Sequence, residues 1–292
     1  MDVAVLGAGD RGQGVARRCF AAAHDVTLHG DDANVVMDCI DQIQRAAGTD
    51  AGAGSLEGTT DLEAGVGGTD VVVEATGDDL SDRRALVARL EAFVGDETLI
   101  ATSDPDTPVS AVAAGLRNPA RAVGLYFLDG ADVAEVVAAD QTASEALERA
   151  VSFVETAGCV PLVARDAPGF VVTRLDMALV AEAARLVEAE VASVPDIDRA
   201  LERGRGHDAG PLALADRLGL DRVVAALEQL SRRLGERFDP PELLTRKVDS
   251  GHLGVKTGTG FYHWEGGQRG DPADPNPSVS VRDEVETDPT DR

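Results

Sequence analysis

The sequence predicts an α/β domain built on a Rossmann-like, doubly wound parallel sheet, followed by a mainly helical domain. Three observations lead to this prediction. The chain opens with the apolar run 3–6, which delivers Gly7, Gly9 and Gly12 into a helical segment. Apolar strands then alternate with helical segments through the first half of the chain. After Gly169, apolar residues recur at helical spacing and no further long strand is expected before about residue 261.

The opening segment has the spacing of a dinucleotide-binding turn. Gly7 allows a tight turn after the buried strand, and Gly9 lets main-chain N–H groups approach a pyrophosphate. Gly12 permits the helix, expected over 12–23, to lie close to the strand and to point its N-terminus at the phosphates. The alternative is a Gly-rich turn in another kind of α/β unit.

A second strand is expected over 25–29 and ends in acidic residues. Asp31 stands about twenty residues beyond the glycines, where a carboxylate would hold a ribose hydroxyl. An acid here, in place of arginine, favours NAD over NADP, although Gly30 occupies the position where the acid is first expected. Asp31 and Asp32 also have a simpler interpretation as surface charges.

The rest of the first domain continues the alternation of helices and strands. A Gly/Ala/Ser-rich loop is expected over 48–60. Strands are expected over 70–75, 98–101, 122–127, 133–138 and 160–164, and helices over 33–47, 81–93 with Ser81 as the N-cap, 109–116 and 144–157.

Composition divides the chain of 292 residues into three segments. Residues 1–166 form the dinucleotide-binding domain and residues 167–264 the helical domain. Residues 265–292 hold Gly, Pro and Asp with few apolar side chains, so an acidic, disordered tail is expected there.

The charge of the chain restricts its partners. The formal net charge is −25, and only two of the 27 basic residues are lysines, Lys247 and Lys256. Such a surface repels nucleic acid and anionic membranes, and it is typical of a protein from a high-salt cytoplasm. No apolar stretch has membrane length and no signal-peptide pattern opens the chain, so a cytoplasmic protein is expected. The three cysteines lack the spacing of metal ligands, so no metal site is expected.

Five blocks in this order resemble the 3-hydroxyacyl-CoA dehydrogenase family, including its relatives that act on sugar acids. The blocks are VLGAGDRGQGVA (5–16), DVVVEATGDDLSDRRAL (70–86), DAPGFVVTRL (166–175), GHDAGPLALADRLGLD (206–221) and LGVKTGTGFY (253–262). The resemblance implies an N-terminal NAD domain and a C-terminal helical domain that forms a homodimer. It also implies an acyl-CoA site in the cleft between the two domains.

In that family a His–Glu pair does the chemistry. The imidazole takes the proton of the 3-hydroxyl while hydride leaves for the nicotinamide, and the carboxylate orients the ring. The glutamate matches Glu135, but Tyr126 occupies the place of the histidine. The resemblance therefore implies Glu135 and Tyr126 as the catalytic residues. For Tyr126, an aromatic residue that ends a core strand is the alternative.

The resemblance also assigns residues to cofactor and substrate. It places Glu74, Arg83 and Ser103 at the cofactor, although Glu74 would serve equally well as a structural carboxylate and Arg83 as an exposed helix residue. It places Thr173 and Asp129 at the substrate. Ser103 and Thr173 each stand where the family has asparagine, and Pro105 stands where it has serine.

The phosphate turn departs from the family as well, because Asp10 would repel a pyrophosphate unless Arg11 compensates. Two functions follow from these observations. The first is an NAD-dependent oxidoreductase acting on a 3-hydroxyacyl-CoA or another 3-hydroxy acid. The second is a non-catalytic relative that keeps the binding of NAD or acyl-CoA.

Overall fold

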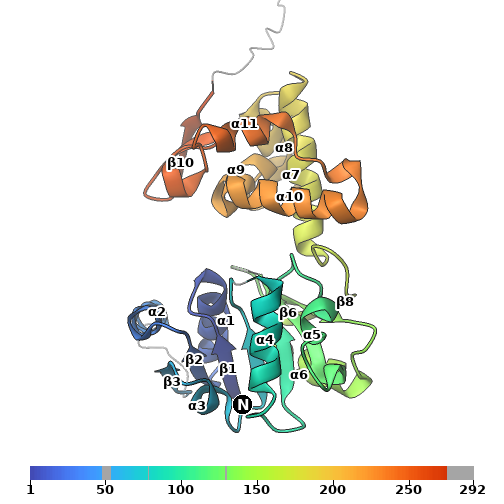
Figure 1. The fold of residues 1–292 in the computed structure, drawn as a ribbon. Coiled ribbons are helices and arrows are strands. Elements are labelled where there is room, and N and C mark those ends of the chain that lie inside the picture. Colours follow the sequence, from blue (N-terminus) through green and yellow to red (C-terminus); the bar gives the residue numbers. More distant parts are fainter. Residues whose placement is uncertain (48–53, 78, 129, 275–292) are drawn as a thin grey trace, which may run out of the picture. The chain divides into compact units, whose positions relative to one another are not determined.

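The computed structural model describes residues 1–47, 54–77, 79–128 and 130–274 (Figure 1). The chain forms two compact units, Met1–Thr173 and Arg174–Arg292, of which the second is described as far as residue 274. The division falls in the first turn of helix α7 (Val172–Glu188), whereas the sequence predicts the boundary after residue 166, just before this helix.

The first unit contains an eight-stranded sheet in the order β3-β2-β1-β4-β5-β6-β7-β8. The strands are β1 (Asp2–Leu6), β2 (Asp25–His29), β3 (Leu56–Thr59), β4 (Val71–Glu74), β5 (Leu99–Thr102), β6 (Ala122–Phe127), β7 (Val133–Ala138) and β8 (Val160–Arg165). All neighbouring pairs are parallel except β6 and β7, which are antiparallel. The doubly wound sheet is mainly parallel, as the sequence predicts, and this one pair is antiparallel because residues 128–132 are too few to make a crossover connection.

Helices cover both faces of this sheet, which explains its continuous apolar strands (Figure 1). In β1, Val3 and Val5 pack in one apolar cluster with α1, α2 and α6, whereas Ala4 and Leu6 pack in another with α3, α4 and α5. The helices are α1 (Asp10–Ala21), α2 (Ala33–Ala47), α3 (Leu62–Val66), α4 (Leu80–Leu90), α5 (Val109–Ala113) and α6 (Ser144–Thr156).

Two local expectations need correction. The segment predicted to be a loop over 48–60 contains β3, a strand whose residues are too polar to give an apolar signal and which is held by its pairing with β2. Helix α4 is capped by Asp79 and not by Ser81. The Asp79 carboxylate accepts hydrogen bonds from the backbone N–H groups of Ser81 (2.8 Å) and Asp82 (3.1 Å), which satisfies the first turn two residues earlier than expected.

The second unit is mainly helical, as predicted. After α7 come α8 (Val194–Arg205), α9 (Pro211–Leu218), α10 (Leu220–Leu234) and α11 (Glu242–Asp249), followed by the antiparallel strands β9 (Tyr262–Glu265) and β10 (Gln268–Pro272). The fully buried carboxylate of Asp216 joins α9 to β9, because it accepts hydrogen bonds from the backbone N–H groups of Phe261 (2.8 Å) and Tyr262 (2.9 Å).

Strand β10 lies within the segment that was expected to be a disordered tail. This strand is polar and mostly exposed, so ion pairs, and not the burial of apolar side chains, hold it and the residues after it. Arg269 pairs with Glu202 of α8 at 2.6 Å, and the buried Lys247 of α11 pairs with Asp274 at 2.7 Å. The expectation was therefore wrong for residues 265–274, and the remainder of the expected tail, 275–292, lies outside the described residues.

Two buried histidines of the first unit should make its stability depend on pH. Burial lowers the pKa of His24, which also lies beside the N-terminal amino group, and burial lowers the pKa of His29. Below the ordinary value of about 6.5 the unfolded chain then binds more protons than the folded chain. The free energy of unfolding should therefore fall as the pH drops from 7.5 to 5.5, as measured by urea denaturation.

The variant His24→Gln should reduce this loss, because it removes one of the two buried imidazoles. The variant His252→Gln changes an exposed histidine and should keep the pH dependence of the parent protein. If the free energy of unfolding changed equally with pH in His24→Gln and in the parent protein, His24 would not contribute to the pH dependence.

Candidate active site

A cavity of about 560 Å³ lies at the carboxyl ends of β1, β2 and β4. The order of the strands reverses between β1 and β4, and ligands of open α/β sheets bind at such a switch point. Residues from the opening turn, the end of β2, the end of β4 and helix α4 line the cavity, among them Gly7, Gly9, Asp31, Thr76 and Arg89.

Of the three glycines predicted to bind the cofactor, Gly7 and Gly9 line this cavity, and Gly12 lies in α1 close to Gly7. Gly7 has φ +112°, and a Cβ atom on Gly12 would lie only 1.8 Å from the Gly7 oxygen, so these two positions allow no side chain. A Cβ on Gly9 would meet nothing within 4 Å, so Gly9 opens space over the N-terminus of α1, where it is the N-cap. This cradle fits a pyrophosphate, because main-chain N–H groups at a helix start bind anions.

The structure places Asp31 on the cavity wall, where the sequence expects the ribose to be held. Position 30, where the acid is first expected, has no room for a side chain, because a Cβ there would lie 2.9 Å from a methyl group of Val36. The exposed Val35 of α2 and Arg89 of α4 also line the cavity, although sequence reasoning singled out neither.

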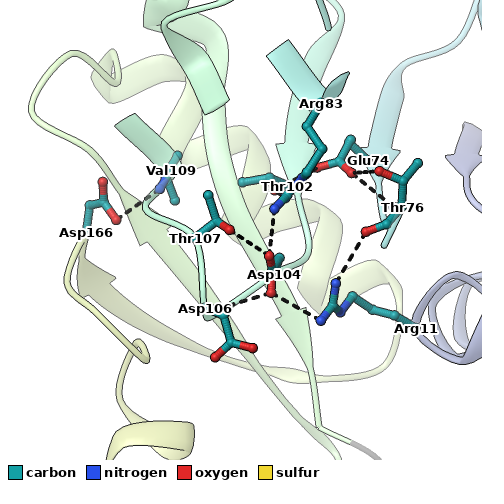
Figure 2. A network of polar contacts seen from close by, with 10 residues as sticks. All are labelled: Arg11, Glu74, Thr76, Arg83, Thr102, Asp104, Asp106, Thr107, Val109 and Asp166. Carbon is teal, nitrogen blue, oxygen red and sulfur yellow. Dashed lines mark hydrogen bonds and ion pairs between the residues drawn. The ribbon is translucent and has the colours of Figure 1, made fainter. Parts of the chain in front are cut away.

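A buried ion-pair network lies at the ends of β4 and β5 (Figure 2). The guanidinium of Arg83, which is 1% exposed, donates to Oε2 of the fully buried Glu74 at 2.7 and 3.0 Å and to Oδ2 of Asp104 at 2.6 Å. Thr102 adds its hydroxyl, which donates to Glu74 Oε2 (2.9 Å). Burial opposes the charge of Arg83, but these carboxylates outweigh it and raise the pKa of the guanidinium.

The network corrects the sequence interpretation of Arg83 and shows the surroundings of Ser103. Arg83 is not an exposed helix residue, and its described contacts are with Glu74, Thr102 and Asp104 beneath the surface. Ser103 is also buried, at 1% exposed, and donates its backbone N–H to the Glu74 carbonyl at 2.8 Å. The Ser103 hydroxyl has no hydrogen-bond partner among the described residues.

Sequence reasoning missed the link between Arg11 and Asp104. Arg11 Nη2 lies 3.1 Å from Asp104 Oδ1, and its Nη1 donates to the Thr76 carbonyl at 3.5 Å. Next to this pair, burial raises the pKa of Asp106, and the negative charge of Asp104 raises it further. A buried acid in the segment SDPDTP needs a cation, and the unusual arginine in the glycine turn was the available signal.

Tyr126 and Glu135 lie opposite each other on β6 and β7. Directly paired residues of antiparallel strands share a face of the sheet, so the two predicted catalytic residues lie on the same face. Tyr126 is half-buried beside an apolar cluster that includes Phe170. Glu135 is fully buried, and its Oε1 accepts hydrogen bonds from the backbone N–H groups of Val171 (2.7 Å) and Val172 (3.2 Å).

Through these two hydrogen bonds the Glu135 side chain contacts the start of α7. Val172, the second donor, is the residue directly before Thr173. The structure thus brings Tyr126, Glu135 and the backbone next to Thr173 into one region of the first unit. The other residue expected at the substrate, Asp129, lies outside the described residues. Across the described ranges, no three His, Cys, Asp or Glu side chains are grouped to hold a metal ion, and no helix has the length and hydropathy to cross a bilayer.

Comparison with known families decides the assignment. The NAD-binding domain of 3-hydroxyacyl-CoA dehydrogenase matches residues 2–167, and the C-terminal domain of the same enzyme matches residues 169–264. The chain belongs to the 3-hydroxyacyl-CoA dehydrogenase family.

Members of the family resemble the chain over most of its length. A probable 3-hydroxybutyryl-CoA dehydrogenase from Deinococcus radiodurans is 32% identical over 279 residues, which cover 90% of this chain and all of the relative. The crystal structure of FadB2 from M. tuberculosis has a TM-score of 0.85 at 31% identity and covers 90% of this chain and 98% of its own. That of (S)-3-hydroxybutyryl-CoA dehydrogenase PaaH1 from Ralstonia eutropha has a TM-score of 0.82 at 26% identity, with 90% and 99% covered.

The family match and the cavity agree on the cofactor. The part of the chain that matches the family's NAD-binding domain contains all the described residues that line the cavity at the switch point. The glycine cradle fits a pyrophosphate, and Asp31 stands on the wall beyond it. NAD is therefore the cofactor that this 3-hydroxyacyl-CoA dehydrogenase family member is built to hold.

Proposed function

We propose that the protein is an NAD-dependent dehydrogenase that interconverts a 3-hydroxyacyl-CoA, or a related 3-hydroxy acid, and its 3-oxo form. The observation that carries the proposal is the glycine-lined cavity at the switch point of a chain that matches both domains of one dehydrogenase family. Two relatives with similar structure or sequence are named as 3-hydroxybutyryl-CoA dehydrogenases, which supports a short 3-hydroxyacyl-CoA as the first substrate to test.

The reaction needs a hydride acceptor, which NAD supplies when bound, and a group that exchanges a proton with the 3-oxygen. Tyr126 is the residue we assign to this exchange, with Glu135 opposite it on β7. A phenol has an ordinary pKa of about 10, so at neutral pH it donates a proton more readily than it accepts one. Reduction of the 3-oxo form should therefore be faster than oxidation of the 3-hydroxy form.

Glu135 has a second task in this assignment. Its Oε1 holds the first backbone N–H groups of α7, so the carboxylate fixes the main chain beside Thr173 while it faces the side of the sheet that carries Tyr126. We assign Thr173 and Asp129 to the substrate, Asp31 to the ribose of NAD, and Glu74, Arg83 and Ser103 to the support of the nicotinamide side. We further propose a homodimer formed by the helical domain and a cytoplasmic location.

The test is a titration with NAD, followed by assays of NADH formation and consumption at high salt. The substrates are a panel of 3-hydroxyacyl-CoAs and 3-hydroxy acids with their 3-oxo forms. The proposal expects NAD binding and measurable turnover, faster in the direction of reduction. NAD binding without turnover of any substrate would favour the second candidate, a binding protein, which the tyrosine at position 126 supports. Failure to bind NAD would remove the dehydrogenase and would leave a binding protein only for acyl-CoA.

A further inference from the structure

The first turn of α1 carries two charged residues at the edge of the cofactor cradle. Asp10 and Arg11 follow directly after Gly9, so a carboxylate and a guanidinium both stand close to the open space over the helix start. A negative charge there stabilises the helix but repels a pyrophosphate. The position of the Arg11 guanidinium therefore decides whether this turn attracts or repels the cofactor.

The residues that hold the Arg11 guanidinium come from the segments after β4 and β5 and not from α1. Its Nη2 lies 3.1 Å from Asp104 Oδ1, and its Nη1 donates to the carbonyl of Thr76, a residue that lines the cavity (Figure 2). The Arg11 side chain keeps 33% of its surface exposed. An arginine has five N–H donors, so these two contacts leave donors for an anion.

Asp104 is itself held by several polar contacts. Its side chain is 10% exposed, and its Oδ2 accepts hydrogen bonds from Arg83 Nη1 (2.6 Å) and from the Thr107 hydroxyl (2.8 Å). A line of ion pairs thus runs from Glu74 through Arg83 and Asp104 to Arg11 (Figure 2). Without Arg11, the two carboxylates of this line would face a single guanidinium beside the cofactor cradle.

We propose that Asp104 is a positioning residue that holds Arg11 against the cradle, where the Arg11 guanidinium binds the pyrophosphate of the dinucleotide. This inference rests on the cofactor named in the proposed function. It adds a phosphate-binding cation and its anchor, two residues that are 93 positions apart in the chain. Because the two residues act as one unit, the effects of replacing them should not add.

The test is calorimetric titration of NAD, ADP-ribose and adenosine into the variants Arg11→Met, Asp104→Asn and the double variant. Arg11→Met should weaken the binding of NAD and of ADP-ribose about tenfold to hundredfold, which corresponds to the loss of one charge-assisted hydrogen bond. The affinity for adenosine should not change. Asp104→Asn should also weaken the binding of NAD, and the double variant should bind NAD with the affinity of Arg11→Met. The losses should shrink at high salt.

The Asp104→Asn result separates positioning from simple electrostatics. Removing a negative charge near a pyrophosphate would by itself tighten NAD binding, so tighter binding by Asp104→Asn would overturn the proposal. Unchanged affinities for NAD in Arg11→Met would overturn it as well. Arg17→Met, which removes the same charge from an exposed position of α1, is the matched control and should bind NAD like the parent protein.

Two further measurements keep the result interpretable. Arg11→Lys retains the charge but loses the planar fork, so it should bind NAD with an affinity between those of the parent and Arg11→Met. Urea denaturation without ligand shows that each variant is folded. If the parent protein bound neither NAD nor ADP-ribose, the proposed function would fall together with this inference, whereas equal NAD affinities in parent and variants would remove this inference alone.

Discussion

The variant Tyr126→His is expected to raise the rate of oxidation of a 3-hydroxyacyl-CoA by about 10²–10⁴-fold, the usual contribution of general acid–base catalysis. An imidazole titrates near neutral pH, whereas a phenol has a pKa of about 10 and is a poor base at pH 7. The structure supports the exchange, because residue 126 lies directly opposite Glu135 across two antiparallel strands. Cβ atoms of such pairs are about 4.5–5.5 Å apart, within reach of a hydrogen bond between the side chains.

The measurement is the turnover of NAD with a panel of 3-hydroxyacyl-CoAs as a function of pH. Tyr126→Phe removes the hydroxyl with little change in shape and should be slower than the parent protein in both directions. Neither variant should alter the affinity for NAD, because Tyr126 does not line the cavity at the switch point. Equal oxidation rates for the parent and Tyr126→His would show that position 126 is not at the reacting carbon.

The variant Arg83→Met is expected to lower the free energy of unfolding by about 3–5 kcal/mol, the usual loss when one partner of a buried ion pair is removed. The guanidinium is the cation shared by Glu74 and Asp104, whose side chains are 0% and 10% exposed. Without it, two carboxylates remain in a buried position with reduced compensation. Such a loss is a large part of the stability of a typical domain.

Urea denaturation measures this effect, and pH tests its cause. Burial without a cation raises the pKa of a carboxyl group, so the difference between Arg83→Met and the parent should shrink as the pH falls and the carboxylates become protonated. The double variant Glu74→Gln with Arg83→Met should be more stable than Arg83→Met alone. Arg84→Met, at an exposed position of the same helix, is the matched control and should change stability by less than about 1 kcal/mol. If Arg83→Met and Arg84→Met lowered the free energy of unfolding equally, the buried ion-pair network would not be the source of the stability.

The elements with strong local signals could be predicted from the sequence. The glycine turn, β2, β6 and β7 lie where the apolar runs and spacings place them, because each signal is contained within a few neighbouring residues. Elements without a continuous apolar run were missed. Strand β3 depends on pairing with β2, and β10 depends on ion pairs such as Arg269 with Glu202. Such contacts join residues that are far apart in the chain and leave little local pattern.

The same reason limits the prediction of the site. Spacing alone identified the three glycines and Asp31, and the structure places Gly7, Gly9 and Asp31 in the lining of one cavity. It could not show that Arg83 is buried, because an arginine on a helix with few apolar neighbours reads as a surface residue. Nor could it pair Arg11 with Asp104, since only the parallel packing of β1, β4 and β5 brings the start of α1 close to the end of β5.

The hydrogen bonds from Val171 and Val172 to Glu135 have a consequence for the improvement of this protein by directed evolution. A substitution at position 135 chosen for its chemistry also releases the backbone at the start of a 17-residue helix, so a gain in rate and a loss of folding are coupled at that position. A change at position 126 leaves these two hydrogen bonds in place, so beneficial changes should accumulate there while the glutamate persists through successive rounds of selection.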